Sequence, residues 1–230
     1  MTFKIFSKLS KEITVAAKLG SKDPQMNPRL RSAIQEARSS NMPKGNIERA
    51  INKSEVNKNF NYSSLVYEGF GPEKIAVIIE ALTDNKNRTA SNIRTIFQKF
   101  GGSLGETGTA SHQFKQVGVI RIEKKKISEN EILELAINAG AEDCSSSDLE
   151  HKIVTVKKNF YKVKIEIEKK IQDFISSGIE WIPINKVLLN SEKTKFVLNF
   201  LETLEEDDDI QHVYANLEIE KNYKEKKFIS

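Results

Sequence analysis

The sequence predicts an α+β protein in which a helical N-terminal region is followed by α/β units. Apolar residues recur with the period of an α-helix through the first 56 of the 230 residues. Beyond residue 62, short apolar runs typical of strands alternate with helical patterns. A polar stretch without any period, residues 54–61, separates the two patterns and predicts a linker.

The first helix is predicted over residues 2–18. On a helical wheel its apolar side chains share one arc of roughly 120°, formed by Phe6, Leu9, Ile13, Ala16 and Ala17. A lysine face covers roughly 80° on the opposite side, formed by Lys4, Lys8, Lys11 and Lys18. The pattern predicts an amphipathic helix with one buried and one basic side.

Two further short helices complete a predicted bundle. A loop ends at Asn27, which is placed to cap a helix whose first residue is Pro28. Its buried face comprises Leu30, Ala33, Ile34 and Ala37, and its basic side chains are Arg29, Arg31 and Arg38. The third helix follows Pro43, turns Ile47, Ala50 and Ile51 inward, and leaves Lys44 and Arg49 to solvent.

The first α/β unit begins with predicted strands at residues 65–71 and 75–82, joined at Gly71-Pro72. The second strand is apolar on both faces and is therefore expected to be central. A helix follows, with Ile93, Ile96, Phe97 and Phe100 inside and Gly101-Gly102 as its stop. A second strand pair, residues 109–115 and 119–123, is predicted to break at Gly118.

A second, smaller α/β unit is predicted from Ser128 onward. Ser128 and Glu131 match a capping box before an inward face of Ile132, Leu133, Ala136 and Ile137, and Gly140 ends the helix. A strand at 153–156 is followed by a long helix marked by Phe160, Val163, Ile167, Ile171 and Phe174, then by a strand at 179–184. The last helix begins after Ser191 with Phe196, Val197, Phe200, Leu201 and Leu204 inside, and Val213, Ala215, Leu217 and Ile219 alternate in a closing strand before a polar tail.

Composition excludes several classes of protein. Hydrophobic residues make up 38% and charged residues 30%, which is typical of a soluble globular chain rather than a disordered or membrane-spanning one. The N-terminal residues lack the pattern of a signal peptide, so we expect a cytoplasmic protein. Cys144 is the only cysteine and the three histidines are far apart, so we expect no intramolecular disulfide and no multi-thiolate zinc site. We also expect no other metal site and no cofactor.

Charge is distributed unevenly along the chain. Residues 1–60 contain 12 Lys and Arg against 5 Asp and Glu, a balance of +7, whereas residues 61–230 contain 24 against 27. A basic module of this kind indicates contact with a polyanion, because Lys and Arg displace the counterions condensed on nucleic acid. The predicted contacts are Lys4, Lys8, Lys11, Lys18, Arg29, Arg31, Arg38, Lys44 and Arg49.

A second group of basic residues lies where a strand passes into a helix, at residues 84–89. Backbone N–H groups and the side chains of Lys86 and Arg88 can meet a phosphate there. Helix capping by Asp84 or Asn85 explains the same residues at least as well. Lys86 and Arg88 are therefore second-tier predicted contacts.

Three other patterns are interpreted as structural. The glycines at 101, 102, 105 and 108 follow a helix and lack the Gly-Lys-Ser/Thr ending of a phosphate loop, so they indicate a helix stop and a long turn. The acidic run at 202–209 lacks the spacing of a calcium loop and indicates a solvated helix end. No catalytic constellation is present, and we expect neither enzymatic activity nor a small-molecule substrate.

Two long segments carry a specific pattern and read AAKLGSKDPQMNPRLRSAIQEARSSNMPKGNIERAI and YEGFGPEKIAVIIEALTDNKNRTASNIRTIFQKFGGSLGETG. They resemble the YebC/PmpR family, which includes a mitochondrial translational activator of cytochrome c oxidase. Shorter matches lie at 139–143, 182–183 and 209–216. Members of the family usually begin with a short basic segment before the position of Lys4, and this chain starts almost at that position.

The resemblance implies three domains, the last two of ferredoxin-like type with the third inserted into the second. The corresponding boundaries are 1–56 for the helical domain, 62–125 with 190–220 for the second domain and 126–189 for the inserted domain, leaving 221–230 as a tail. The final helix and strand are thereby expected to return to the second domain.

The resemblance also implies a non-enzymatic regulator of gene expression. Members are described as DNA-binding transcriptional regulators, whereas others resemble ribosome-associated translation factors that ease synthesis through proline-rich stretches. The predicted partner is nucleic acid, either DNA or ribosomal RNA, with the ribosome as the assembly in the second case and no membrane in either. A protein–protein scaffold with an incidental basic face is the alternative from a different class.

Overall fold

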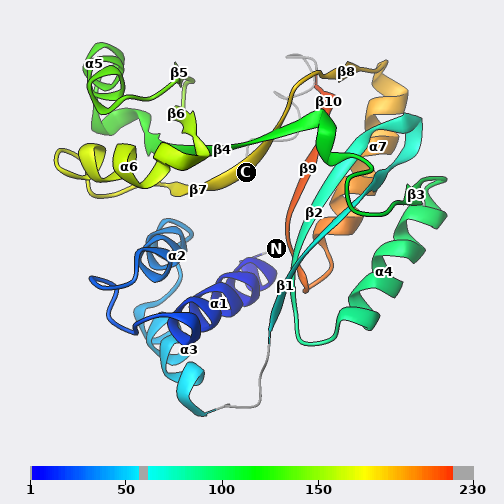
Figure 1. Ribbon diagram of the computed structural model, residues 1–230, viewed down its shortest axis with the longest axis horizontal. Helices are drawn as coiled ribbons and strands as arrows, with labels where there is room; N and C mark the ends of the chain where they lie inside the picture. Colours follow the sequence, from blue (N-terminus) through cyan, green and yellow to red (C-terminus); the bar gives the residue numbers. More distant parts are fainter. Residues whose placement is uncertain (1, 57–61, 220–230) are drawn as a thin grey trace. The chain divides into compact units, whose positions relative to one another are not determined.

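A computed structural model of the chain describes residues 2–56 and 62–219 (Figure 1). The fold is α+β, as predicted, with an N-terminal helical region followed by two sheet-containing parts. The chain divides into two compact units. The first comprises Met1–Asn59 and Gln116–Glu180, and the second comprises Phe60–Lys115 and Trp181–Ser230.

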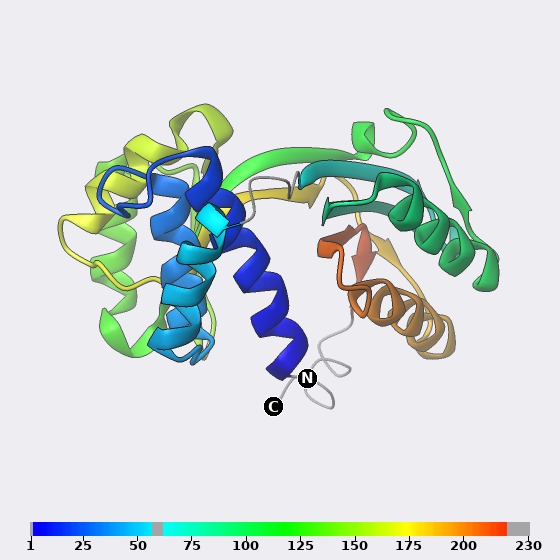
Figure 2. The ribbon, with the colours of Figure 1, turned by 90° about the horizontal axis from the view of Figure 1, so that it is seen from below.

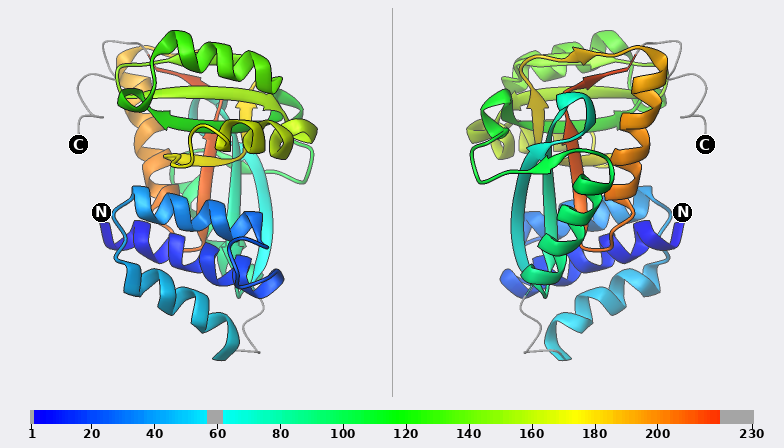
Figure 3. Two further views of the ribbon diagram at one scale, coloured as in Figure 1. Left: turned by 90° about the vertical axis from the view of Figure 1, so that its left-hand side faces the viewer. Right: turned by 90° about the vertical axis from the view of Figure 1, so that its right-hand side faces the viewer.

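The helical region of the first unit consists of α1 (Thr2–Leu19), α2 (Pro28–Ser39) and α3 (Lys44–Val56) (Figure 3). Their inward faces form one core that matches the predicted residues, with Ile13, Leu30 and Ala37 fully buried. The linker prediction was wrong for residues 54–56, which belong to α3. The Ser54 hydroxyl donates to the Ile51 carbonyl, and this bond accommodates a polar residue in the last turn. The rest of the predicted linker lies outside the described residues.

The loop between α1 and α2 is held by Asn27, which is buried. Its side-chain oxygen accepts the N–H of Leu30, and its amide donates to the carbonyls of Ala16 and Ser21. Pro28 occupies the first turn of α2, where no N–H is needed. One side chain therefore caps α2, as predicted, and also fastens it to the end of α1, which was not predicted.

The sheet of the first unit has the strand order β5-β6-β4-β7. Its elements are β4 (Phe114–Glu123), α5 (Glu129–Ala139), β5 (Asp143–Ser146), β6 (Glu150–Val156), α6 (Phe160–Glu168) and β7 (Ser176–Pro183). This order is the ferredoxin-like arrangement. Both helices pack through Ile132 and Val163 on strand residues such as Ile120 and Ile153, forming one core.

Along these elements and the residues just before them, three predictions were wrong in detail and one strand was missed. Gly118 does not break a strand: β4 runs through it, and the glycine leaves room for Phe160, which occupies the space that a Cβ would take. The segment before Phe114 is a short 3₁₀ turn instead of the start of a strand. The helix α6 ends at Glu168, although Ile171 and Phe174 still reach the core from the following loop. The strand β5, which is polar, was not predicted.

Two helices also expose residues predicted to face inward. Leu133 and Ile137 of α5 are exposed, because Ile132, Leu135, Ala136 and Ala139 make the buried face. Phe196 of α7 (Ser191–Glu205) is 48% exposed, and the centroid of its ring lies 5.5 Å from that of Phe100. The capping box of Ser128 and Glu131 and the left-handed Gly140 at the end of α5 are confirmed.

The main sheet of the second unit has the strand order β3-β1-β2-β9. It comprises β1 (Ser63–Phe70), β2 (Ala76–Thr83), β3 (Ser103–Leu104) and β9 (Ile210–Ala215), and β2 is internal and buried on both faces as predicted. A short parallel pair, β8 (Val187–Leu188) with β10 (Leu217–Glu218), accompanies it. The helices α4 (Lys86–Lys99) and α7 (Ser191–Glu205) lie side by side on one face, as Figure 2 shows.

The core between these helices and the sheet contains Ile75, Val77, Phe97 and Phe200. The Phe97 and Phe200 rings meet edge to face with centroids 5.0 Å apart. The pairing of β9 with β2 brings the end of the chain back to the strands that begin this unit.

The three-domain boundaries remain a prediction. Within the described residues, no helix is long and apolar enough to cross a membrane.

Candidate nucleic-acid interface

The lysine face of α1 is only partly open to solvent. Lys4 is exposed, whereas Lys8, Lys11 and Lys18 are half-buried. Each of them already has an interaction partner within the protein. A phosphate would therefore have to compete with an existing contact at each of these lysines, which the helical wheel alone does not reveal.

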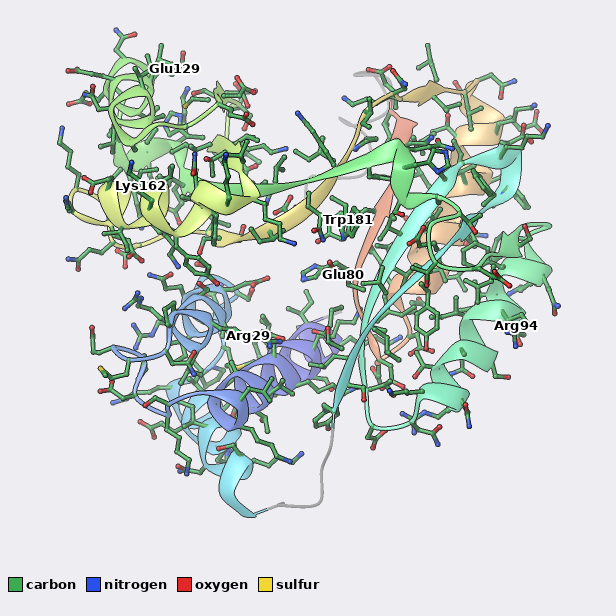
Figure 4. The ribbon with its side chains drawn as sticks, in the orientation of Figure 1. Arg29, Glu80, Arg94, Glu129, Lys162 and Trp181 are labelled. Carbon is green, nitrogen blue, oxygen red and sulfur yellow. The ribbon has the colours of Figure 1, made fainter. Side chains whose placement is uncertain are left out.

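Arg29 of α2 forms an ion pair with Glu12 of α1 inside the helical region. Its Nε and Nη2 donate to the two carboxylate oxygens of Glu12 in α1, at 2.7 and 3.0 Å (Figure 4). This bidentate bond raises the pKa of Arg29 above its ordinary value, and the charge of Glu12 adds to the effect. The side chain remains 42% exposed, so one edge of the guanidinium still faces solvent.

Arg31 and Arg38, also on α2, line a cavity of about 640 Å³ within the first unit. The opposite walls come from Glu123 at the end of β4, from Lys126 just after it, and from Glu168 at the end of α6. The loop after α6 adds Gln172, Asp173 and Phe174. Two hydrogen bonds hold α2 to this loop: Gln35 Nε2 donates to the Gln172 carbonyl at 2.9 Å, and Ser39 Oγ donates to the Phe174 carbonyl at 2.9 Å.

A buried lysine supports the same arrangement. Lys164 of α6 donates to Ser32 Oγ of α2 at 2.7 Å, and its Nζ lies 3.7 Å from Glu168. Burial lowers the pKa of Lys164, and the neighbouring Arg31 lowers it further, whereas Glu168 raises it. This contact and the bonds from Gln35 and Ser39 together fix the position of α2 against α6 and the loop after it.

The cavity carries both signs of charge, because Arg31, Arg38 and Lys126 face Glu123, Glu168 and Asp173. Lys126 pairs with Asp173 at 3.4 Å, and Arg31 Nε lies 3.9 Å from Glu168 Oε1, too far for a hydrogen bond. Within residues 2–56 and 62–219, Arg31 Nε, Gln35 Oε1 and Glu168 Oε1 are buried without a hydrogen-bond partner. No ion pair to the exposed Arg38 is found in the same residues.

Lys44 and Arg49 of α3 are exposed, as predicted. Lys44 is 86% exposed and lies 3.6 Å from Glu48 one turn away. Arg49 donates to the Gly45 carbonyl at 3.1 Å and to the side chain of Asn46. All three contacts are local and solvated, so they cost little to exchange for a phosphate.

The second-tier residue Arg88 has a structural role. It donates to Asp209 at 2.7 Å and to Asp84 at 2.8 Å, and these bonds raise its pKa. The buried Asp209 also accepts from Thr83 at 3.0 Å and Thr89 at 2.9 Å. Asp209 is therefore not part of a solvated helix end, and that prediction was wrong for it.

Lys86 lies exposed at the beginning of α4. The helix is capped by Asn85, whose side chain accepts the Arg88 N–H at 3.0 Å, as the capping interpretation anticipated.

In the glycine run, Gly101 and Gly108 have positive φ angles of 73° and 94°, consistent with a helix stop and a turn. Cys144 is half-buried, and burial raises the pKa of its thiol.

Sequence reasoning missed Lys126, Gln35 and Glu168 as cavity residues. The run Lys124-Lys125-Lys126 is a signal that could have indicated the lysine. Gln35 and Glu168 carry no such signal, because only the packing of α2 beside the loop after α6 brings them together.

Comparison with known proteins gives consistent matches over nearly the whole chain. Residues 2–57 match the family model described as the TACO1/YebC protein N-terminal domain, and residues 62–217 match that of the TACO1/YebC second and third domain. The chain is 62% identical over 219 residues to the probable transcriptional regulatory protein SAR11_0592 of Pelagibacter ubique (strain HTCC1062). That alignment covers 95% of this chain and 91% of the relative.

A solved structure is also similar. The crystal structure of the conserved hypothetical protein Aq1575 from Aquifex aeolicus superposes with a TM-score of 0.85 at 44% sequence identity. The superposition covers 95% of this chain and 90% of that chain.

Proposed function

The chain belongs to the TACO1/YebC family, and from this premise we propose that it is a non-enzymatic regulator of gene expression that binds nucleic acid through its basic helical region. The observation that carries the proposal is the placement of Arg31 and Arg38 on one cavity, beside an excess of basic residues in 1–60. The name of the Pelagibacter relative, a probable transcriptional regulatory protein, supports a regulatory role.

The contacts are proposed to be made with phosphates. Arg38, Lys44 and Arg49 are exposed and can exchange solvent or a weak local contact for a phosphate oxygen. A guanidinium can grip a phosphate through two parallel hydrogen bonds, whereas lysine acts as a point charge. Such contacts supply affinity and register rather than choice of sequence.

The test measures the binding of the full chain to fluorescently labelled RNA and to labelled duplex DNA. Fluorescence anisotropy at a fixed salt concentration gives each affinity. Arg38→Glu is expected to weaken binding about 10-fold for every sequence tried, the equivalent of one charge-assisted hydrogen bond. Arg94→Glu is the matched control, because it makes the same charge change on an exposed residue of α4 (Figure 4). Equal losses for the two variants would remove the cavity from the interface.

A ribosomal target is the second candidate, and the carboxylates of the cavity favour it. A continuous duplex surface would meet Glu123 and Glu168 beside the arginines, and like charges disfavour that contact. Folded or single-stranded RNA can present one phosphate, or one edge, to a mixed-charge cavity. Of the two candidates, the mixed charge of the cavity therefore favours ribosomal RNA over duplex DNA.

Sedimentation of the untagged protein from a fresh lysate distinguishes these partners. Co-migration with ribosomal particles that is lost after RNase treatment is expected for a translation factor. A protein that stays at the top of the gradient and binds purified duplex DNA would be a transcriptional regulator. Absence of affinity for either nucleic acid at low salt would favour a protein–protein scaffold.

A further inference from the structure

The main sheet of the second unit has two faces of different character. Val77 and Ile79 of β2 point into the core beneath α4 and α7, whereas Ala76 and Ile78 belong to a separate apolar cluster on the opposite face. Because side chains alternate along a strand, the register places Glu80 on this second face, opposite Val66 of β1 and His212 of β9.

Aromatic side chains gather on this second face. Trp181 and Tyr214 pack against its apolar cluster, together with the buried Phe114. Trp181 and Tyr214 are half-buried and His212 is exposed, so each keeps part of its ring surface in solvent. The His212 and Tyr214 rings have centroids 6.0 Å apart and planes inclined by 35°. Aromatic rings that are partly exposed to solvent and packed on an apolar cluster form a surface on which another flat ring can stack.

A carboxylate lies among these rings. Trp181 Nε1 donates to Glu80 Oε1 at 3.0 Å, and the Tyr214 hydroxyl lies 3.4 Å from Glu80 Oε2, with Glu80 and Trp181 side by side in Figure 4. In the described part of the chain no lysine or arginine forms an ion pair with Glu80. A carboxylate offers about four lone-pair sites, so Glu80 can accept further N–H donors while it orients the indole.

These features together define the chemistry of a partner. It should have a flat π-face for the rings and N–H groups at its edge for Glu80, a combination that nucleobases provide. The base must be unpaired, because pairing hides its N–H edge, and single-stranded RNA presents bases in this way. Charge is also favourable: exposed Lys115 follows Phe114, and exposed Lys186 lies on the segment after Trp181.

We propose that this face of the second unit, formed by Trp181, Tyr214, His212 and Glu80, binds an unpaired base of single-stranded RNA by stacking and by an N–H bond to Glu80. The inference rests on the proposed function, since it assigns a second contact for the same partner. It adds what the helical region does not supply, because phosphate contacts carry affinity but a base edge at Glu80 carries selectivity.

Trp181 is the only tryptophan of the chain, so its emission reports this face alone. Titration of the full-length protein with a ten-nucleotide single-stranded RNA of mixed sequence is expected to quench this emission saturably. The midpoint should match the affinity obtained from the anisotropy of the labelled RNA. Double-stranded RNA of the same sequence is expected to leave the emission unchanged.

Variants separate the contributions of stacking and hydrogen bonding. His212→Ala and Glu80→Gln are each expected to weaken single-stranded RNA binding about 10-fold, within the range found for loss of one stacked base. His212 is exposed, so its replacement leaves the core intact. Phe196→Ala is the matched control, since this exposed aromatic residue lies on α7, on the other side of the sheet.

Each outcome decides a specific point. RNA binding without any change in Trp181 emission, or equal affinities for His212→Ala and the wild type, would overturn the base-stacking proposal and leave the proposed function intact. Quenching by single-stranded DNA with the same midpoint would overturn the choice of RNA. Absence of any nucleic-acid binding by anisotropy would overturn the proposed function itself.

Discussion

Gly118 of β4 lies directly against Phe160, the first residue of α6. A Cβ built there would lie 2.5 Å from Phe160 Cδ2 and 2.8 Å from Thr155 Cγ2. Gly118→Ala is therefore expected to destabilise the protein by about 1–3 kcal/mol, because Phe160 must leave its position in the core. Urea denaturation followed by circular dichroism measures the change.

Gly178 in β7 provides the matched control. A Cβ at Gly178 would meet nothing within 4 Å, and its φ is not in the left-handed region. Gly178→Ala should leave stability unchanged or raise it slightly, because the unfolded chain loses freedom. A similar loss of stability at both positions would show that Phe160 is not the cause.

Glu68 of β1 makes the stability of the second unit depend on pH. Burial would raise its pKa, but hydrogen bonds from the backbone N–H groups of Gly108, Ala110 and Ser111 outweigh burial and lower it. The Ala110 and Ser111 nitrogens lie 3.0 and 2.8 Å from Glu68 Oε2. The folded state therefore favours the ionised carboxylate more than the unfolded state does.

The sign of the pH dependence follows from this lowered pKa. The contribution of Glu68 is fully present above the ordinary glutamate pKa of about 4.3 and is lost as the pH falls through the lower pKa of the folded state. Glu68→Gln is expected to cost about 1–2 kcal/mol at neutral pH. The difference should shrink in acid, as measured by thermal melts from neutral pH to about pH 3. A difference that is constant with pH would contradict the assignment.

At the scale of the element, Asn27 does more than cap α2. It accepts one hydrogen bond at the start of α2 and donates two to backbone carbonyls outside that helix. Asn27→Ala is expected to destabilise the protein by about 2 kcal/mol, since buried backbone groups lose their partners. Asn85→Ala, which removes only the cap of α4, should cost about 1 kcal/mol.

Asn27→Asp tests the same element without removing the cap. Aspartate keeps the acceptor for the Leu30 N–H but cannot donate to Ala16 and Ser21. An intermediate loss of stability is expected from chemical denaturation. Full stability in this variant would show that the two donated bonds contribute nothing to holding the loop.

Helix boundaries show what local patterns can and cannot predict. Periodicity and caps place α1, α2, α4 and α7 within a few residues, because both signals arise from neighbours along the chain. The same period continues through Ile171 and Phe174, yet α6 stops at Glu168. Those two residues pack in the core from a loop, and packing rather than helical period explains their apolar character.

At the scale of the whole molecule, the charge of residues 1–60 predicts the salt dependence of binding. The logarithm of the affinity for duplex DNA should fall linearly with the logarithm of salt, with a slope of about −0.9 for each phosphate contact. Reversing Lys8 and Lys11 to Glu is expected to weaken binding and make the slope less negative by about 1–2. Anisotropy titrations between about 50 and 200 mM salt measure it.

The double charge reversal tests whether the lysine face of α1 contacts nucleic acid. Both lysines already have partners in the protein, so their contribution depends on exchange of those contacts. A slope and affinity identical to the wild type would remove the α1 face from the interface. The arginine cavity, together with Lys44 and Arg49 of α3, would then account for phosphate binding.

By itself the sequence determined the fold class, most helices and strands, several caps and the basic N-terminal region. These follow from composition, periodicity and short-range contacts, which need no knowledge of the path of the chain. It also indicated Arg31 and Arg38 as cations on one side of α2, although not what lies across from them.

Only the tertiary structure decided which charged residues remain available. In the folded protein Arg29 donates to Glu12 and Arg88 donates to Asp209, whereas Arg38 lines a cavity. The tertiary structure also brought Glu80 to Trp181, which lies 101 residues further along the chain. Contacts between such distant residues depend on strand order and helix packing, and no local pattern in the sequence encodes them.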